Sequence, residues 1–320
     1  MLATDLIMSL TQAGFDVSGF DLPEVDITDR HAVQRAIDDA KPDLVIHTAA
    51  MTAVDACEDA VETAMTVNRD GAGNVAAAAA VIGAPIIHIS TDYVFNGRGT
   101  RPYLEDDTID PLGVYGRTKA EGEAAVAAAN PAYIICRTSW LYGINGKNFV
   151  STILRMAGER DELTIVNDQV GCPTFTGHLS NALAVVSRAL LDTSENIRPS
   201  LHGIYHTVNS EQCSWHEFAQ TILQAAGITH AEGTGLPDHS RTNRPIIHAL
   251  RAVAIEIRED VVRLVDRHLV VDFIDIIGDV LRPPLVEVGM SATGGVVDVA
   301  RTGVGVVDAV RVLDAGRRQP

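Results

Sequence analysis

The segment that decides the fold reads IIHIST at residues 86–91, VYGRTKA at residues 114–120 and YIICR at residues 133–137. An apolar run, a longer helical stretch and a second apolar run are typical of a strand, a crossover helix and a strand of a parallel sheet. Open α/β sheets of this kind bind their ligands at the carboxyl ends of the strands. Thr91 ends the first run, so we expect its hydroxyl at a ligand-binding edge.

Tyr115 and Lys119 lie four residues apart, so on a helix they share one face. A phenol has a pKa of about 10, and a nearby ammonium group favours the phenolate and lowers that pKa. Such a tyrosine can protonate an alkoxide as it forms, and the Thr91 hydroxyl would hold the same carbonyl oxygen. In isolation, the pair is more typical of a surface contact on an amphipathic helix.

Composition restricts the class of protein. The 320 residues are 46% hydrophobic, which is enough for one large core or two smaller ones. The formal net charge of −17 repels nucleic acid and anionic membranes, so we expect neither as a partner. No apolar run approaches the ~18 residues of a membrane span, and the first residues lack a signal-peptide pattern, so we expect a cytoplasmic protein. The four cysteines have no metal-ligand spacing, so we expect no metal site formed by cysteines.

Six motifs occur in one order along the chain: VIHTAAMTAVDACE, ISTDYVFNG, PLGVYGRTKAEGE, RTSWLYG, NDQVGCPT and GIYHTVN followed by SWHEFA. Over about residues 1–227 they resemble the dTDP-4-dehydrorhamnose reductases, which are extended short-chain dehydrogenase/reductases. The resemblance implies an α/β fold, with a Rossmann-like doubly wound parallel sheet and a small C-terminal substrate-binding lobe.

The same resemblance implies an oxidoreductase that uses NADPH or NADH to reduce the C4 keto group of dTDP-4-dehydro-L-rhamnose, a nucleotide-sugar substrate. It implies that the catalytic residues are Thr91, Tyr115 and Lys119. Besides Tyr115 and Lys119, the implied cofactor contacts are Asp21, Asp26, Ile27, Ala49, Ala50 and Thr52. The implied substrate contacts are Thr91, Asp92, Trp140, Gln169, Gly171, Pro173 and Thr174.

Two other functions stay open. One is a non-catalytic regulatory subunit, since the chain also resembles the β subunit of methionine adenosyltransferase. The other is a nucleotide-sugar epimerase or dehydratase of the same superfamily. The presence of Thr91, Tyr115 and Lys119 favours an enzyme. Some relatives form a homodimer with Mg²⁺ at its interface, and the sequence leaves that arrangement open here.

We expect three parts in the chain. Residues 1–150 would form the NAD(P)-binding domain, and residues 151–245 a substrate-binding portion interleaved with it. Residues 246–320 depart from the family and read as an atypical tail. The opening segment MLATDL resembles the end of the family's glycine turn. We therefore expect the first strand to be missing, which would leave a gap at the centre of the sheet.

The histidines of the apolar runs, His47, His88 and His206, read as packed core residues rather than ligands. Lysine is rare, since the chain contains only Lys41, Lys119 and Lys147.

Overall fold

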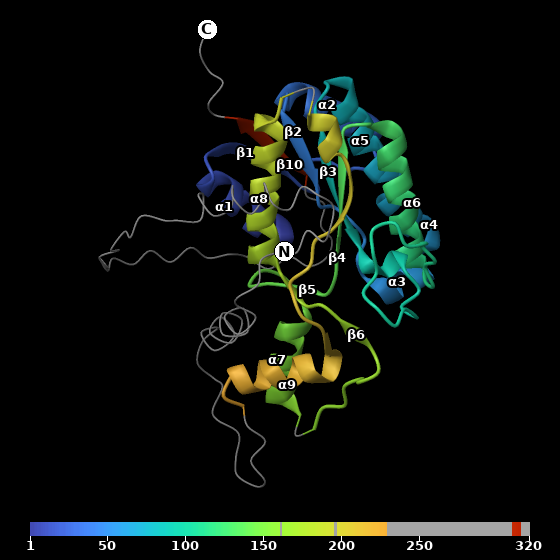
Figure 1. Cartoon of the computed structure of the whole chain (residues 1–320), viewed down its shortest axis with the longest axis vertical. Coiled ribbons are helices and arrows are strands. Elements are labelled where there is room, and N and C mark those ends of the chain that lie inside the picture. Colours follow the sequence, from blue (N-terminus) through green and yellow to red (C-terminus); the bar gives the residue numbers. More distant parts are fainter. Residues whose placement is uncertain (161, 195–196, 229–308, 315–320) are drawn as a thin grey trace, which may run out of the picture.

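The computed structural model describes residues 1–160, 162–194, 197–228 and 309–314 (Figure 1). Its main sheet has the strand order β1-β10-β2-β3-β4-β8. These strands are β1 (Phe15–Phe20), β2 (Leu44–His47), β3 (Ile86–Thr91), β4 (Tyr133–Thr138), β8 (Gly203–His206) and β10 (Ala309–Asp314). Two small sheets pair β5 (Leu141–Tyr142) with β7 (Thr174–Phe175), and β6 (Val170–Gly171) with β9 (Cys213–Ser214).

Helices connect the strands and cover both faces of the main sheet (Figure 1). The α-helices are α1 (Leu2–Gln12), α2 (Arg30–Ala40), α3 (Val54–Asp59), α4 (Val61–Met65), α5 (Ala72–Val81), α6 (Val114–Ala129), α7 (Phe149–Glu159), α8 (Thr176–Asp192) and α9 (Trp215–Ala225). One π-helical turn, η1 (Thr66–Gly71), and two 3₁₀ turns, η2 (Asp92–Val94) and η3 (Arg198–Leu201), complete the described elements.

The side chains of β2 point alternately to the two faces of the main sheet and show which residues pack on each face. Leu44 and Ile46 belong to the core that α1 and α8 cover. Val45 points to the other face, into the core formed with α2, α5 and α6. Neighbouring residues of a strand face opposite sides, so a strand buried on both faces becomes apolar throughout. This explains why β2 and β3 are mainly apolar in the sequence, with His88 as the one interruption before the polar strand ends.

A smaller lobe lies at one end of the molecule (Figure 1). Helices α7 and α9 pack there through Ile153, Phe218 and Ile222, together with Tyr142 of β5. Asn148 and Ser214 start the two helices, and each forms a reciprocal capping box with the residue three positions later. Among the described residues, no helix is both long enough and apolar enough to span a membrane.

The expected gap at the centre of the sheet is wrong, because β10 occupies it. Phe20 of β1 pairs with Ala309, which in turn pairs with His47 of β2. Strand β10 runs antiparallel to both neighbours, while β2, β3, β4 and β8 are mutually parallel as expected. Six residues of the atypical tail therefore supply the pairing that β1 and β2 need, and the rest of residues 246–320 lies outside the described residues.

Helix α6 lies unusually close to its neighbours because two of its residues lack side chains. A Cβ on Gly116 would collide with the carbonyl oxygen of Tyr93, and one on Gly122 with the carbonyl oxygen of Asn68. These two glycines let α6 approach η2 and η1, which brings the face that bears Tyr115 against the end of β3.

We predict that deletion of residues 309–320 lowers the melting temperature by several degrees and speeds amide exchange in β1 and β2, because both strands lose a hydrogen-bonded neighbour. Deletion of residues 315–320 is the matched control and should leave both properties unchanged. Equal exchange protection in the two truncated proteins, measured by mass spectrometry, would contradict the placement of β10.

Candidate active site

Thr91 lies at the carboxyl end of β3, as expected. Its backbone pairs with Thr138 of β4, and its side chain is buried. The Thr91 hydroxyl accepts a hydrogen bond from the Tyr93 backbone N–H at 3.2 Å and donates one to Asp92 Oδ1 at 3.1 Å. It thus caps η2 and is held in one orientation at the edge where α/β sheets bind ligands.

Tyr115 lies in the first turn of α6 and is only 9% exposed. Its ring packs edge-on against Tyr93 at a centroid distance of 5.4 Å. Burial raises the pKa of the Tyr115 phenol well above its usual value, and the hydrogen bond with the Thr91 side chain opposes part of that rise. In this structure Tyr115 is therefore a protonated phenol at neutral pH, next to Thr91.

Lys119 lies one turn further along α6 and is 2% exposed. Its Nζ atom donates to the Ile89 carbonyl oxygen at 2.7 Å and contacts His88 Nε2 at 3.2 Å. Burial lowers the pKa of Lys119 to about 8, against a smaller opposing effect of Glu123. The expected net lowering of the Tyr115 pKa is therefore wrong for this structure, because burial raises that pKa.

Asp92 is the third titratable group at this edge. Burial raises the pKa of its carboxyl to about 6, although the hydrogen bond from Thr91 works in the opposite direction. A buried carboxylate costs stability, and residues perturbed in this way are enriched at functional sites. The predicted substrate contact at Asp92 therefore lies in the same cluster as Thr91 and Tyr115.

The loop after β2 brings the small side chains of Ala49 and Ala50 to the sheet edge, and Ala49 is 1% exposed. Thr52 is exposed.

Asn68 fixes this loop through its side-chain amide. The amide accepts a hydrogen bond from the Met51 N–H at 2.8 Å, donates one to the Met51 carbonyl at 3.1 Å, and donates one to Thr118 Oγ1 at 3.0 Å. The sequence did not identify Asn68, because only the fold places its side chain beside Met51.

Three of the predicted cofactor contacts, Asp21, Asp26 and Ile27, lie in the segment after β1. The Ile27 side chain is buried and packs against Gly71, so a base could reach only its backbone. Asp26 Oδ1 accepts from the Thr28 N–H and hydroxyl at 2.9 and 2.8 Å, which makes a local turn. Asp21 follows β1 and accepts from the Leu22 N–H at 2.7 Å.

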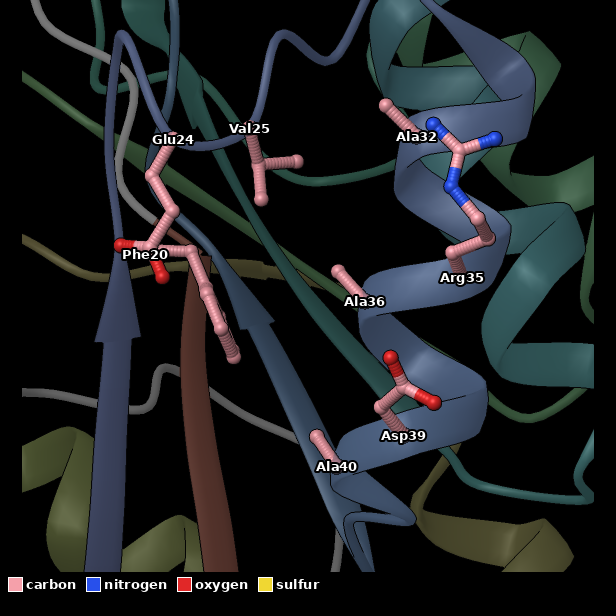
Figure 2. Close-up of a pocket in the computed structure, with 8 residues that line it drawn as sticks. All are labelled: Phe20, Glu24, Val25, Ala32, Arg35, Ala36, Asp39 and Ala40. Carbon is pink, nitrogen blue, oxygen red and sulfur yellow. The ribbon is translucent and has the colours of Figure 1, made fainter.

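A hollow of about 390 Å³ lies between β1 and α2, as Figure 2 shows. Phe20, Glu24 and Val25 come from the end of β1 and the segment after it, and Arg35 and Asp39 come from α2. None of the predicted site residues lines this hollow, so it is separate from the Thr91–Tyr115–Lys119 cluster.

The predicted substrate residues of the smaller lobe surround Trp140. Its indole stacks on Trp215 at a centroid distance of 3.5 Å, and a Cβ on Gly171 would lie 2.5 Å from its ring. The Thr174 N–H donates to the Trp140 carbonyl at 3.3 Å. The sequence reading missed Trp215, because only the fold brings α9 to this site. Of the other predicted contacts, Pro173 is buried and Gln169 is exposed.

Comparison with known proteins gives one consistent answer. A family model described as the RmlD substrate binding domain matches residues 1–254. The dTDP-4-dehydrorhamnose reductase of Sinorhizobium fredii is 46% identical over 201 residues, which cover 63% of this chain and 67% of that protein. The chain belongs to the dTDP-4-dehydrorhamnose reductase family.

Longer matches and solved structures agree with this family. The spore coat polysaccharide biosynthesis protein SpsK of Bacillus subtilis is 39% identical over 259 residues, 80% of this chain and 87% of that protein. The crystal structure of a dTDP-4-dehydrorhamnose reductase from Clostridium acetobutylicum has a TM-score of 0.66 and 40% identity, covering 73% of this chain and 79% of that one. The Bacillus anthracis reductase in complex with NADP has the same TM-score, with 39% identity, and covers 72% of this chain and 78% of that one.

We predict that Gly171→Ala disturbs the indole stack, because the new methyl group collides with Trp140. Overpacking of this kind costs about 1–3 kcal/mol of unfolding free energy. The chain has two tryptophans and both belong to the stack, so tryptophan emission reports on it directly. Gly158→Ala, on α7 with open space around it, is the control; it should leave the emission unchanged and should not lower stability, because alanine favours a helix more than glycine does. Identical spectra for both variants would argue against the close packing.

We also predict that Asp92→Asn stabilises the protein at pH 8. The folded-state pKa of about 6 exceeds the ordinary 3.8, so the charged carboxylate opposes folding. This penalty grows as the pH rises from 3.8 to 6 and reaches about 3 kcal/mol above that range. Urea unfolding at pH 4.5 and pH 8 measures it. Asp107→Asn should instead destabilise the protein at pH 8, because Arg101 lowers the pKa of that half-buried carboxyl. A stabilisation independent of pH would refute the assignment to Asp92.

Proposed function

We propose that the chain reduces the C4 keto group of dTDP-4-dehydro-L-rhamnose to give dTDP-L-rhamnose, with NADPH or NADH as reductant. The observation that supports this most directly is the contact between the Thr91 and Tyr115 side chains at the carboxyl edge of the sheet, in a member of the dTDP-4-dehydrorhamnose reductase family. A threonine and a protonated tyrosine side by side offer two hydroxyl groups to one carbonyl oxygen.

The described residues fit the nicotinamide half of such a cofactor. Ala49 and Ala50 have small side chains at the end of β2, so a flat ring would be able to approach the loop backbone beside the half-buried Ala50. Tyr115 and Lys119 would bind the adjoining ribose from α6. The residues described before β1 form α1. No residue is assigned here to bind the diphosphate of the cofactor.

In the proposed reaction the bound nicotinamide supplies hydride to C4. The carbonyl π electrons move to the oxygen, which the Thr91 and Tyr115 hydroxyls hold. Tyr115 then transfers its phenolic proton to this oxygen, so the ketone becomes a secondary alcohol and the tyrosine regains its proton from solvent. The burial that raises the Tyr115 pKa keeps the acid protonated before hydride transfer, while the alkoxide that forms is a stronger base than the phenolate.

The smaller lobe would bind the nucleotide sugar. Trp140 offers an indole face or edge to the deoxysugar, and Gly171, Pro173 and Thr174 form the segment that supports it. The predicted cytoplasmic location and the homodimer with Mg²⁺ remain predictions. Within the described part of the chain, no group of three His, Cys, Asp or Glu side chains is arranged to hold a metal ion.

We predict that Tyr115→Phe lowers kcat by about 10² or more, because general acid catalysis contributes about 10²–10⁴. Cofactor affinity should stay within a few fold. Tyr133→Phe, at the opposite end of the sheet, is the matched control and should keep full activity. The assay follows nicotinamide absorbance with dTDP-4-dehydrorhamnose as substrate. Equal turnover in both variants would refute the acid role, and cofactor binding without any turnover by the wild type would favour a regulatory subunit.

A further inference from the structure

Two histidines lie directly beneath the catalytic cluster, and the reaction proposed above does not use them. His47 ends β2, and His88 lies beside it on β3. Both side chains are completely buried. His88 Nε2 lies 3.2 Å from Lys119 Nζ, and His88 Nδ1 lies 2.8 Å from His47 Nδ1. A continuous hydrogen-bonded row therefore runs from α6 across β3 to β2.

The chemistry of lysine fixes the direction of this row. An ammonium group can only donate, so His88 Nε2 must accept and its hydrogen lies on Nδ1. His88 Nδ1–H then donates to His47 Nδ1, and the hydrogen of His47 lies on Nε2. Both imidazoles are neutral in this arrangement. This agrees with burial, which lowers the pKa of His47 to about 3 and that of His88 well below 6.5.

The far end of the row is an unusual feature. His47 Nε2 is buried and finds no hydrogen-bond partner among the described residues. A buried N–H without a partner costs stability, and a native protein retains such a group where it serves another purpose. The geometry indicates one such purpose, which is to fix the tautomer of His88. Only the tautomer with its hydrogen on Nδ1 leaves Nε2 free to accept a hydrogen bond from Lys119.

We propose that His88 is a positioning residue for Lys119, and that His47 holds His88 in the tautomer that accepts from the ammonium group. This inference rests on the proposed function, in which Lys119 binds the nicotinamide ribose. The Ile89 carbonyl and His88 Nε2 together direct two of the three Nζ hydrogens. The third is left for a ligand or for Tyr115.

The other charged groups around Lys119 are already paired. Glu123, one turn further along α6, accepts two hydrogen bonds from Arg137 of β4, at 2.9 and 2.7 Å, and one from Ser90 of β3. On the opposite side, Asp92 is engaged by Thr91. Because Glu123 is occupied in this way, the neutral His88 is the side chain that Lys119 contacts directly.

The test measures Lys119 itself. With three lysines in the chain, and with Lys41 and Lys147 exposed, the side-chain NMR signals of ¹³C-lysine-labelled protein can be assigned and titrated separately. We expect the wild-type Lys119 to titrate near 8. His88→Leu removes the acceptor of the Lys119 hydrogen bond, so the Lys119 pKa should fall by a further one to two pH units. This shift corresponds to the free energy that one charge-assisted hydrogen bond contributes.

Two variants make the result specific. Gln at position 88 offers a carbonyl oxygen near the place of Nε2, so His88→Gln should keep Lys119 closer to the wild-type titration than His88→Leu does. His47→Leu leaves His88 Nδ1–H unpaired and favours the tautomer that donates towards Lys119, so it should lower the Lys119 pKa although it never contacts the lysine. His206→Gln, a histidine of β8 outside the row, is the control and should leave it unchanged.

Activity provides the second readout. In dTDP-4-dehydrorhamnose reduction, the basic limb of the kcat/KM profile should move to lower pH in His88→Leu by the same amount as the Lys119 titration. An unchanged Lys119 titration in both His88→Leu and His47→Leu would overturn the proposal. The titration needs no substrate. A wild-type protein that fails to reduce the substrate would therefore refute the proposed function, while the lysine shifts would still decide whether His88 positions Lys119.

Discussion

The geometry of the candidate active site depends most on the burial of one cation, the Lys119 ammonium group. Lys119 lies between α6 and β3 with 2% of its surface exposed, and an ammonium group in such a place needs hydrogen-bond acceptors to remain charged. The Ile89 carbonyl and His88 provide them, and both belong to β3. The distance between α6 and β3 is therefore constrained by this charge. Gly116 and Gly122 permit the close approach of α6 to η2 and η1. The same approach brings Tyr115 against Thr91.

Burial also decides the protonation states at this edge. For Tyr115, Asp92 and Lys119, desolvation is the largest cause of the pKa shift, and nearby charges or hydrogen bonds are smaller. Each group is pushed towards its neutral form. A neutral tyrosine is the form that can protonate an alkoxide, so the same burial that costs stability at Asp92 suits the acid required of Tyr115.

Backbone hydrogen bonding in the main sheet is a second constraint, and it does not depend on the chemistry of the active site. Strands β1 and β2 both need a partner at the centre, because backbone groups buried without hydrogen bonds are costly. In the described structure β10 meets that need in the antiparallel direction, although it lies beyond residues 1–254, which the family model matches. Backbone pairing is largely independent of sequence, which is why a segment of unrelated composition can occupy this position.

The sequence by itself determined the strand–helix–strand unit, the position of Thr91 at a strand end, the shared helical face of Tyr115 and Lys119, and the family. These features are local or follow from the order of motifs. Only the tertiary structure decided that β10 fills the centre of the sheet, that Trp215 stacks on Trp140, and that His88 rather than Tyr115 is the contact of the lysine. Each of these depends on contacts between residues far apart in the chain and on desolvation, and no spacing in the sequence measures either.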